Sequence, residues 1–121
     1  MAKVLIVDDS PAMIFTLKKW VEDWGHIALT AENGNQALKI ARQEQPHVIL
    51  MDIVMPGMSG FQATRKLSKD QSTKGIPVIF VSMKDGEADR VWGMRQGATA
   101  YVTKPINPDT LLTAITNAIA A

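Results

Sequence analysis

Three short runs of consecutive apolar residues place the strongest constraint on how this chain can fold. They are VLIV at 4–7, VILM at 48–51 and VIFV at 78–81. A strand that faces solvent on one side alternates polar and apolar residues, whereas a strand covered on both faces is apolar throughout. Their β-branched residues favour strand over helix. We therefore expect a sheet that is covered on both faces.

Amphipathic segments with helix start and stop signals separate these runs. Ser10 before Pro11 is a typical helix start, and Gly25 is a typical stop. Weaker strand candidates lie at 27–31 and 99–102. The expected helices run from Pro11 to about Trp24, from about Asn35 to Glu44, from near Ser59, from roughly Asp85 to Gln96, and from Asn107 onward.

The pattern is therefore a strand followed by a helix, repeated five times. Such an alternation predicts an α/β fold, in which a doubly wound parallel sheet carries helices on both faces. Right-handed crossovers leave few possible topologies. We expect residues 1–121 to form a single domain, with no separate output domain.

Composition excludes several classes of protein. The formal net charge of +1 provides no general electrostatic attraction to nucleic acid or to a membrane. The sequence has no cysteine, so it has no disulfide framework and no thiolate metal site. The apolar run near the N-terminus is too short for a signal peptide or a membrane span. We expect a cytoplasmic protein without membrane insertion.

Polar residues follow the ends of the expected strands. In open α/β sheets, ligands bind beyond the carboxyl ends of the strands. Each residue alone has an ordinary role, because aspartate begins turns, serine caps helices and lysine is usually solvated. Together, the carboxylates repel each other unless a cation or a proton intervenes. The residues concerned are Asp8, Asp9, Asp52, Ser82 and Lys104.

These residue types indicate phosphate chemistry with a hard cation. Oxygen ligands without cysteine or paired histidine favour Mg²⁺, and too few oxygens are present for a Ca²⁺ cage. Lys104 and Ser82 can hold phosphoryl oxygens, and a carboxylate that attacks phosphorus forms an acyl phosphate. Asp52 lies within the apolar stretch VILMDIVMPG. Because an unpaired buried charge is strongly disfavoured, we expect a carboxylate at this position to have a function of this kind.

Over its entire length the chain resembles the receiver domain of two-component response regulators. The resemblance rests on the order and spacing of a few residues: Asp8-Asp9, Asp52 in MDIVMPGMSG, Ser82 closing VIFVS, Tyr101, and Lys104-Pro105. It implies a flavodoxin-like sheet with the strand order 2-1-3-4-5.

The resemblance also implies the roles of the site residues. Asp52 would accept the phosphoryl group, and Ser82 and Lys104 would contact it. One Mg²⁺ ion would bind the side chains of Asp9 and Asp52 and the backbone carbonyl of Val54. Asp8 would act on this ion mainly through a bound water. The Lys104-Pro105 bond would be cis. Tyr101 would be the aromatic switch that turns inward after phosphorylation; the alternative is an ordinary half-buried strand aromatic.

Val54 and Lys84 lie two residues after Asp52 and Ser82, where they would flank the water that attacks the phosphoryl group. Val54 has no hydrogen-bonding group that could orient this water. We therefore expect slower self-dephosphorylation than in relatives with an amide or an acid at this position. Lys84 or a partner could compensate.

The expected fourth helix contains Gly86 and Gly93, each of which costs about 1 kcal/mol relative to alanine. A weak helix beside the site suits an element that shifts on phosphorylation. Alternatively, the glycines lie at a helix end or in a tight contact. Trp92 lies one helical step off an expected core stripe of Val91 and Met94, so Trp92, with Tyr101 and Arg95 nearby, is a candidate partner anchor.

Two longer phrases, LMDIVMPGMSGFQATR and VWGMRQGATAYVTKP, are similar to PilH-type single-domain regulators of type IV pilus twitching motility. The implied phosphoryl donor is a phosphohistidine on the sensor kinase of a chemosensory array. The implied output is contact with a downstream motility protein. We expect a monomeric switch that catalyses its own phosphorylation, and not a turnover enzyme. A phosphate sink for another regulator and a flagellar chemotaxis regulator are the alternatives within the family.

Three other classes compete with this interpretation. A Mg²⁺-dependent aspartyl phosphatase resembling the haloacid dehalogenases requires an acid two residues after its nucleophile, where this chain has Val54. A flavin-binding protein of the same fold requires a phosphate loop where this chain has DDSPAM. A degenerate scaffold is disfavoured because every residue of the acceptor site is present.

Overall fold

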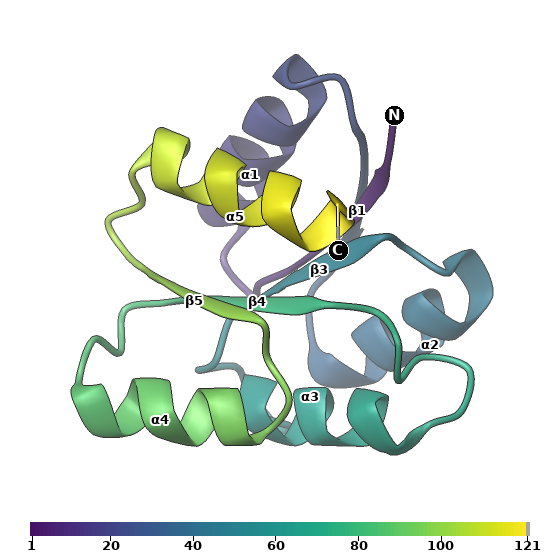
Figure 1. Cartoon of the computed structure of the whole chain (residues 1–121), viewed down its shortest axis with the longest axis vertical. Coiled ribbons are helices and arrows are strands. Elements are labelled where there is room, and N and C mark those ends of the chain that lie inside the picture. Colours follow the sequence, from purple (N-terminus) through teal and green to yellow (C-terminus); the bar gives the residue numbers. More distant parts are fainter. Residues whose placement is uncertain (121) are drawn as a thin grey trace.

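The computed structural model describes residues 1–120. Within these residues, strands and helices alternate along the chain (Figure 1). The strands are β1 (Lys3–Val7), β2 (Ile27–Ala31), β3 (Val48–Met51), β4 (Val78–Ser82) and β5 (Ala100–Thr103). The helices are α1 (Pro11–Asp23), α2 (Gly34–Glu44), α3 (Gly60–Lys69), α4 (Glu87–Arg95) and α5 (Pro108–Ala120).

All strand pairs are parallel, and the strand order is β2-β1-β3-β4-β5. This confirms the doubly wound, flavodoxin-like fold. The register brings Val7 beside both Ala31 and Met51, and it brings Ser82 beside Thr103. The carboxyl ends of neighbouring strands therefore lie at one edge of the sheet. Because β1 lies between β2 and β3, the direction of winding reverses at β1 and β3, where such folds bind ligands.

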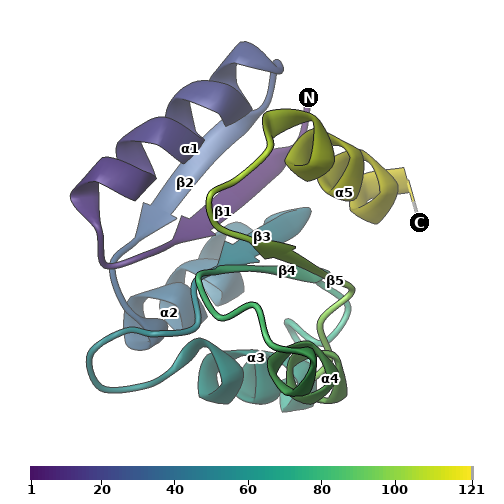
Figure 2. The ribbon, with the colours of Figure 1, turned by 90° about the vertical axis from the view of Figure 1, so that its left-hand side faces the viewer.

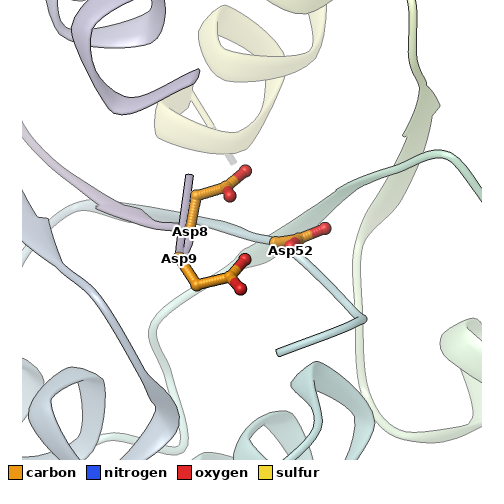
Figure 3. Close-up of side chains that lie close together, drawn as sticks. All are labelled: Asp8, Asp9 and Asp52. Carbon is orange, nitrogen blue, oxygen red and sulfur yellow. The ribbon is translucent and has the colours of Figure 1, made fainter. Parts of the chain in front are cut away.

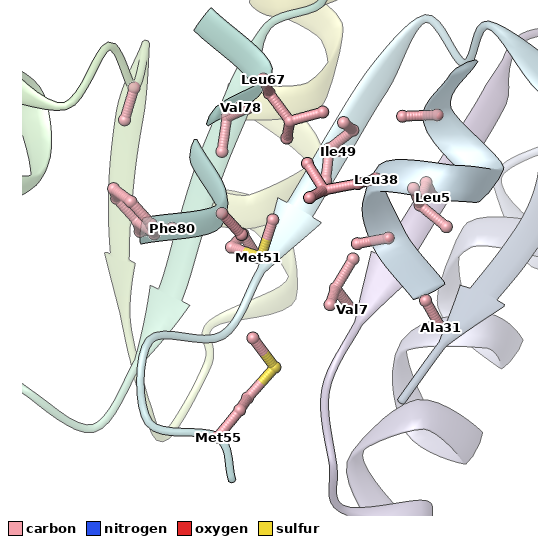
Figure 4. Packing of buried hydrophobic residues seen from close by; sticks show 14 of the residues in the cluster. Leu5, Val7, Ala31, Leu38, Ile49, Met51, Met55, Leu67, Val78 and Phe80 are labelled. Atoms are coloured by element: carbon pink, nitrogen blue, oxygen red, sulfur yellow. The ribbon is translucent and has the colours of Figure 1, made fainter. Parts of the chain in front are cut away.

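Helices cover both faces of the sheet, which explains the uninterrupted apolar strands. Helices α1 and α5 lie on one face, and α2, α3 and α4 lie on the other (Figures 1 and 2). Alternate strand residues enter two separate cores: Leu5, Ile49 and Phe80 enter one, and Ile6, Leu50 and Ile79 enter the other. Figure 4 shows Leu38 of α2 and Leu67 of α3 packed in the first core.

Side-chain caps begin four of the helices: α1, α2, α3 and α5, where Asn107 Oδ1 accepts from the Asp109 and Thr110 amides. The Ser10 hydroxyl accepts from the Met13 amide at 3.3 Å, as expected for the N-cap of α1. Helix α2 begins one residue before the predicted start, because Asn33 caps it by accepting from the Gln36 amide. Ser59 opens α3 in a reciprocal capping box with Gln62.

The predicted core stripe of Val91 and Met94 on α4 is wrong. These two residues are 47% and 44% exposed, whereas Gly93 is buried. A β-carbon at Gly93 would lie 3.0 Å from the Phe80 ring, so α4 contacts the sheet through its backbone at this glycine. The larger apolar side chains are consequently turned outward. Gly86 is the N-cap of α4, and Gly93 makes the tight contact with Phe80. One glycine thus lies at a helix end and the other in a tight contact, as in the alternative to a weak, shifting helix.

We predict that Gly93→Ala lowers the free energy of unfolding, although alanine is the better helix former. The added methyl group would lie against Phe80, and overpacking of a core typically costs about 1–3 kcal/mol. Gly75→Ala is the matched control, because a β-carbon there meets nothing within 4 Å. Urea unfolding measures both variants. A Gly93→Ala variant more stable than wild type would show that the contact is loose.

Candidate functional site

The carboxyl edge of the sheet gathers the polar residues that follow the strands. Asp8 and Asp9 follow β1, Asp52 follows β3, and Lys104 follows β5. Ser82 is the last residue of β4 and is buried. The parallel order therefore brings residues that are distant in sequence to the same end of the sheet. Figure 3 shows the three aspartates side by side at this edge.

The three aspartates form an acidic cluster. One carboxylate oxygen from each of Asp8, Asp9 and Asp52 lies within 4.8 Å of the others. Asp8 and Asp52 are buried, whereas Asp9 is exposed. A compact set of oxygen donors, open on one side, suits a hard cation that retains several waters. The cluster therefore fits Mg²⁺.

Lys104 links two of these carboxylates. Its ammonium nitrogen lies 2.9 Å from Asp8 Oδ2 and 3.5 Å from Asp52 Oδ1. The Lys104 side chain is largely buried, so it partly compensates the two buried negative charges. The Lys104–Pro105 peptide bond is cis.

Ser10 has a second role that sequence reasoning missed. Its backbone amide donates to Asp8 Oδ1 at 2.9 Å, while its hydroxyl caps α1. Both oxygens of Asp8 are thus bonded to protein groups, one to Ser10 and one to Lys104. The spacing of an aspartate two residues before a helix-capping serine is the sequence signal for such a turn.

The environment of Asp52 favours its neutral form. Burial raises the pKa of Asp52 from its ordinary value of 3.8 to about 6, and repulsion from the Asp8 carboxylate contributes to the rise. Lys104 acts in the opposite direction. A cation that bound the cluster would favour the charged form, so metal binding and ionisation of Asp52 are coupled.

Ser82, Lys84 and Tyr101 are connected beside the cluster. The Ser82 hydroxyl accepts from the Lys84 amide at 3.2 Å, so it caps a turn and not α4, which begins later at Glu87. The half-buried Tyr101 donates its hydroxyl to the Lys84 carbonyl. Burial raises the pKa of Tyr101, with the Asp89 carboxylate as the next cause. The Tyr101 hydroxyl is therefore a neutral donor.

The remaining predicted residues lie at the surface. Val54 is 61% exposed in the loop that follows Asp52, and Lys84 is also exposed. Trp92 and Arg95 lie on the outer side of α4, with Trp92 46% exposed. The structure thus brings the acids together with Lys104, and it leaves Trp92 and Arg95 on the outer surface of a neighbouring helix.

Residues 4–116 match the response regulator receiver domain family. The chain belongs to this family. It is 57% identical to protein PilH of Pseudomonas aeruginosa over 121 residues, which cover all of this chain and 99% of PilH. This identity confirms the likeness that the two longer phrases predict.

Solved structures support the same assignment. The chemotaxis protein CheY4 of Vibrio cholerae superposes with a TM-score of 0.91 at 32% identity, over 98% of both chains. The receiver domain of the sensor histidine kinase PA1611 of Pseudomonas aeruginosa superposes with a TM-score of 0.92, over 99% of this chain and 98% of that one. That structure holds a magnesium ion coordinated in its active site cleft. At 23% sequence identity, its superposition on this chain shows that the two share a fold.

The receiver domain is thus a response regulator module of two-component signalling. Receiver domains act as phosphoryl-accepting switches between a sensor kinase and downstream targets, with Mg²⁺ bound at an acidic pocket. Among residues 1–120, no helix combines the length and the apolar character needed to cross a bilayer.

We predict that Asp52→Asn raises the free energy of unfolding of the metal-free receiver domain at pH 7. Because folding raises the Asp52 pKa from 3.8 to about 6, the stability of the wild type falls as pH rises through this window. Above it the cost is on the order of 1–3 kcal/mol, which the neutral amide removes.

Urea unfolding in EDTA at pH 4 and pH 7 measures this effect. Asp85→Asn is the matched control, because it makes the same change at an exposed aspartate. A gain from Asp52→Asn that is equally large at pH 4 and pH 7 would mean that ionisation is not its cause.

Proposed function

We propose that this receiver domain accepts a phosphoryl group on Asp52 in a Mg²⁺-dependent reaction. The donor would be a phosphohistidine of a sensor kinase, and the output would be a protein contact. The observation that carries this proposal is the acidic cluster with Lys104 between Asp8 and Asp52. A nucleophilic carboxylate, a cation site and an ammonium group at one sheet edge are the parts that phosphoryl transfer to aspartate requires.

The acidic cluster would hold the metal. Asp9 and Asp52 would bind one Mg²⁺ through their side chains and Val54 through its backbone carbonyl. Asp8, whose oxygens already accept from Ser10 and Lys104, would act mainly through a bound water. The bound ion would neutralise negative charge on the carboxylates and on the incoming phosphoryl oxygens.

Asp52 would be the nucleophile. One of its oxygens would form a bond to phosphorus as the bond between phosphorus and the histidine nitrogen breaks, and the nitrogen would leave with the electron pair. Lys104, 3.5 Å from Asp52, is within reach of the new phosphoryl oxygens, and the Ser82 hydroxyl would donate to another. These two groups would stabilise charge that develops on the phosphoryl group.

The PilH likeness supports a role in pilus-based twitching motility. PilH matches this chain over 99% of its own length, so the receiver domain would itself be the signalling unit. We also propose that it acts in the cytoplasm as a monomer. The partners would be the kinase of a chemosensory array and a downstream motility protein. Trp92, Arg95 and Tyr101 would contribute to the output contact.

Two roles within the family are alternatives. The domain could drain phosphate from another regulator, or it could control flagellar chemotaxis, which the similarity to the chemotaxis protein CheY4 favours. Capture of partners on the beryllofluoride-treated domain separates an output contact from a phosphate sink. Retention of a motility protein supports an output contact, and retention of a kinase alone supports a phosphate sink.

Asp52→Asn is expected to abolish phosphorylation. We predict that Mg²⁺ and acetyl phosphate add one phosphoryl group to the wild type, which intact-protein mass spectrometry detects as a stable mass increase. Asp85→Asn should retain the increase, and EDTA should prevent it. Sustained phosphate release without a stable adduct would favour an aspartyl phosphatase, and no change would favour a degenerate scaffold.

Val54→Asn is expected to shorten the lifetime of the phosphorylated domain. Val54 is exposed in the loop after Asp52 and has no group that could orient a water. The asparagine amide would add one hydrogen bond to the attacking water. A bond of about 1–1.5 kcal/mol made in the transition state corresponds to about a tenfold faster hydrolysis. Val54→Ala is the control, because it removes apolar bulk without adding a donor. Decay of the phosphorylated wild type within seconds, or equal lifetimes of the two variants, would contradict this prediction.

A further inference from the structure

Gly60, the first residue of α3, lies directly against the peptide group that follows Asp52. A β-carbon at Gly60 would overlap the carbonyl oxygen of Asp52 and would lie 2.8 Å from the Ile53 Cα. Both neighbours are backbone atoms and cannot rotate away as a side chain can. Any residue other than glycine would therefore displace either α3 or the backbone of Asp52.

A hydrogen bond holds this contact together. The Gly60 amide donates to the Ile53 carbonyl at 2.8 Å and closes the loop between β3 and α3. Val54 lies within this loop. The capping box of Ser59 and Gln62 begins α3 at the same point. The start of α3 is thus attached to the backbone that carries both Asp52 and Val54.

The backbone of Asp52 is also held from its other side. Its amide donates to the Val7 carbonyl of β1 at 2.9 Å. The Asp52 residue is consequently clamped between the end of β1 and the start of α3. Because a carboxylate is joined to its backbone by only two rotatable bonds, this clamp restricts where the Asp52 oxygens can lie relative to Asp8 and Asp9.

We propose that Gly60 is a positioning residue for the acceptor site. Its missing side chain lets α3 set the position of the Asp52 backbone, and thereby of the carboxylate and the Val54 carbonyl. This inference rests on the proposed phosphoryl transfer to Asp52. A displacement of about 1 Å costs up to about a hundredfold in such reactions, and loss of a group that orients a metal ligand costs about 10–100-fold in metal affinity.

Gly60→Ala tests this proposal with Gly34→Ala as its matched control. Gly34 is the first residue of α2, so both changes add the same methyl group at the same helical position. The three atoms nearest to a β-carbon at Gly34 would all belong to the Met58 side chain, and not to the backbone. Ser59→Ala is a second control, because it weakens the start of α3 and leaves Gly60 unchanged.

Three quantities are measured for each variant: the free energy of unfolding, the Mg²⁺ affinity by calorimetry, and the rate of phosphorylation by acetyl phosphate. We expect Gly60→Ala to lower affinity and rate by about 10–100-fold, and both controls to remain near wild type. A folded Gly60→Ala variant with wild-type affinity would overturn the proposal. Equal losses in Ser59→Ala would also overturn it, because they would assign the effect to the stability of α3.

A measurement on the wild type covers the case in which Gly60→Ala does not fold. Because coupling between two sites is reciprocal, Mg²⁺ should slow hydrogen exchange of the Gly60 amide. The Thr73 amide, bonded to the Asp70 carbonyl in the turn after α3, is the comparison. Equal effects of Mg²⁺ on the two amides would overturn the proposal.

The two proposals fail in different ways. If the wild type binds Mg²⁺ but accepts no phosphoryl group, the proposed function is wrong, and the Mg²⁺ affinities of the variants still test Gly60. If the wild type is phosphorylated and Gly60→Ala matches it, only the positioning role of Gly60 is wrong.

Discussion

The contact of the Lys104 ammonium with two buried carboxylates is the interaction on which the site depends. Asp8 and Asp52 are buried close together, and without a cation their repulsion would oppose folding. Lys104 reaches them only because β5 lies beside β4 in a parallel sheet. The strand order therefore brings Lys104 to the acidic cluster. A metal ion in the cluster would complete the neutralisation that Lys104 begins.

The apolar strands form the core and also determine the position and the surroundings of Asp52. VILM at 48–51 is buried on both faces, and Asp52 follows it where the sheet ends. Burial by this surrounding structure raises the pKa of Asp52 to about 6, so a cation bound nearby would strongly affect the charge of this carboxylate. The start of α3 then restrains the same residue through its backbone. Core packing and site geometry are thus connected at one peptide group.

Most of the fold follows from local patterns. Each of the three apolar runs forms a buried strand, and the Ser10 and Ser59 signals mark helix starts because caps act within a few residues. The α4 stripe could not be predicted in the same way. Helical spacing identifies a stripe of Val91 and Met94 but does not determine which face of the helix meets the sheet. Close contact through Gly93 decided that, against the larger side chains.

The sequence by itself determined the strand–helix alternation, the family, and the residue types at the carboxyl edge, since these depend on residue order and near neighbours. Only the tertiary structure decided which oxygens Lys104 contacts, that Ser10 also holds Asp8, and that Gly60 lies on the Asp52 peptide. These contacts join segments that different strands and helices bring together. Their geometry depends on distances of a few tenths of an ångström, which packing of the whole domain sets and no local pattern encodes.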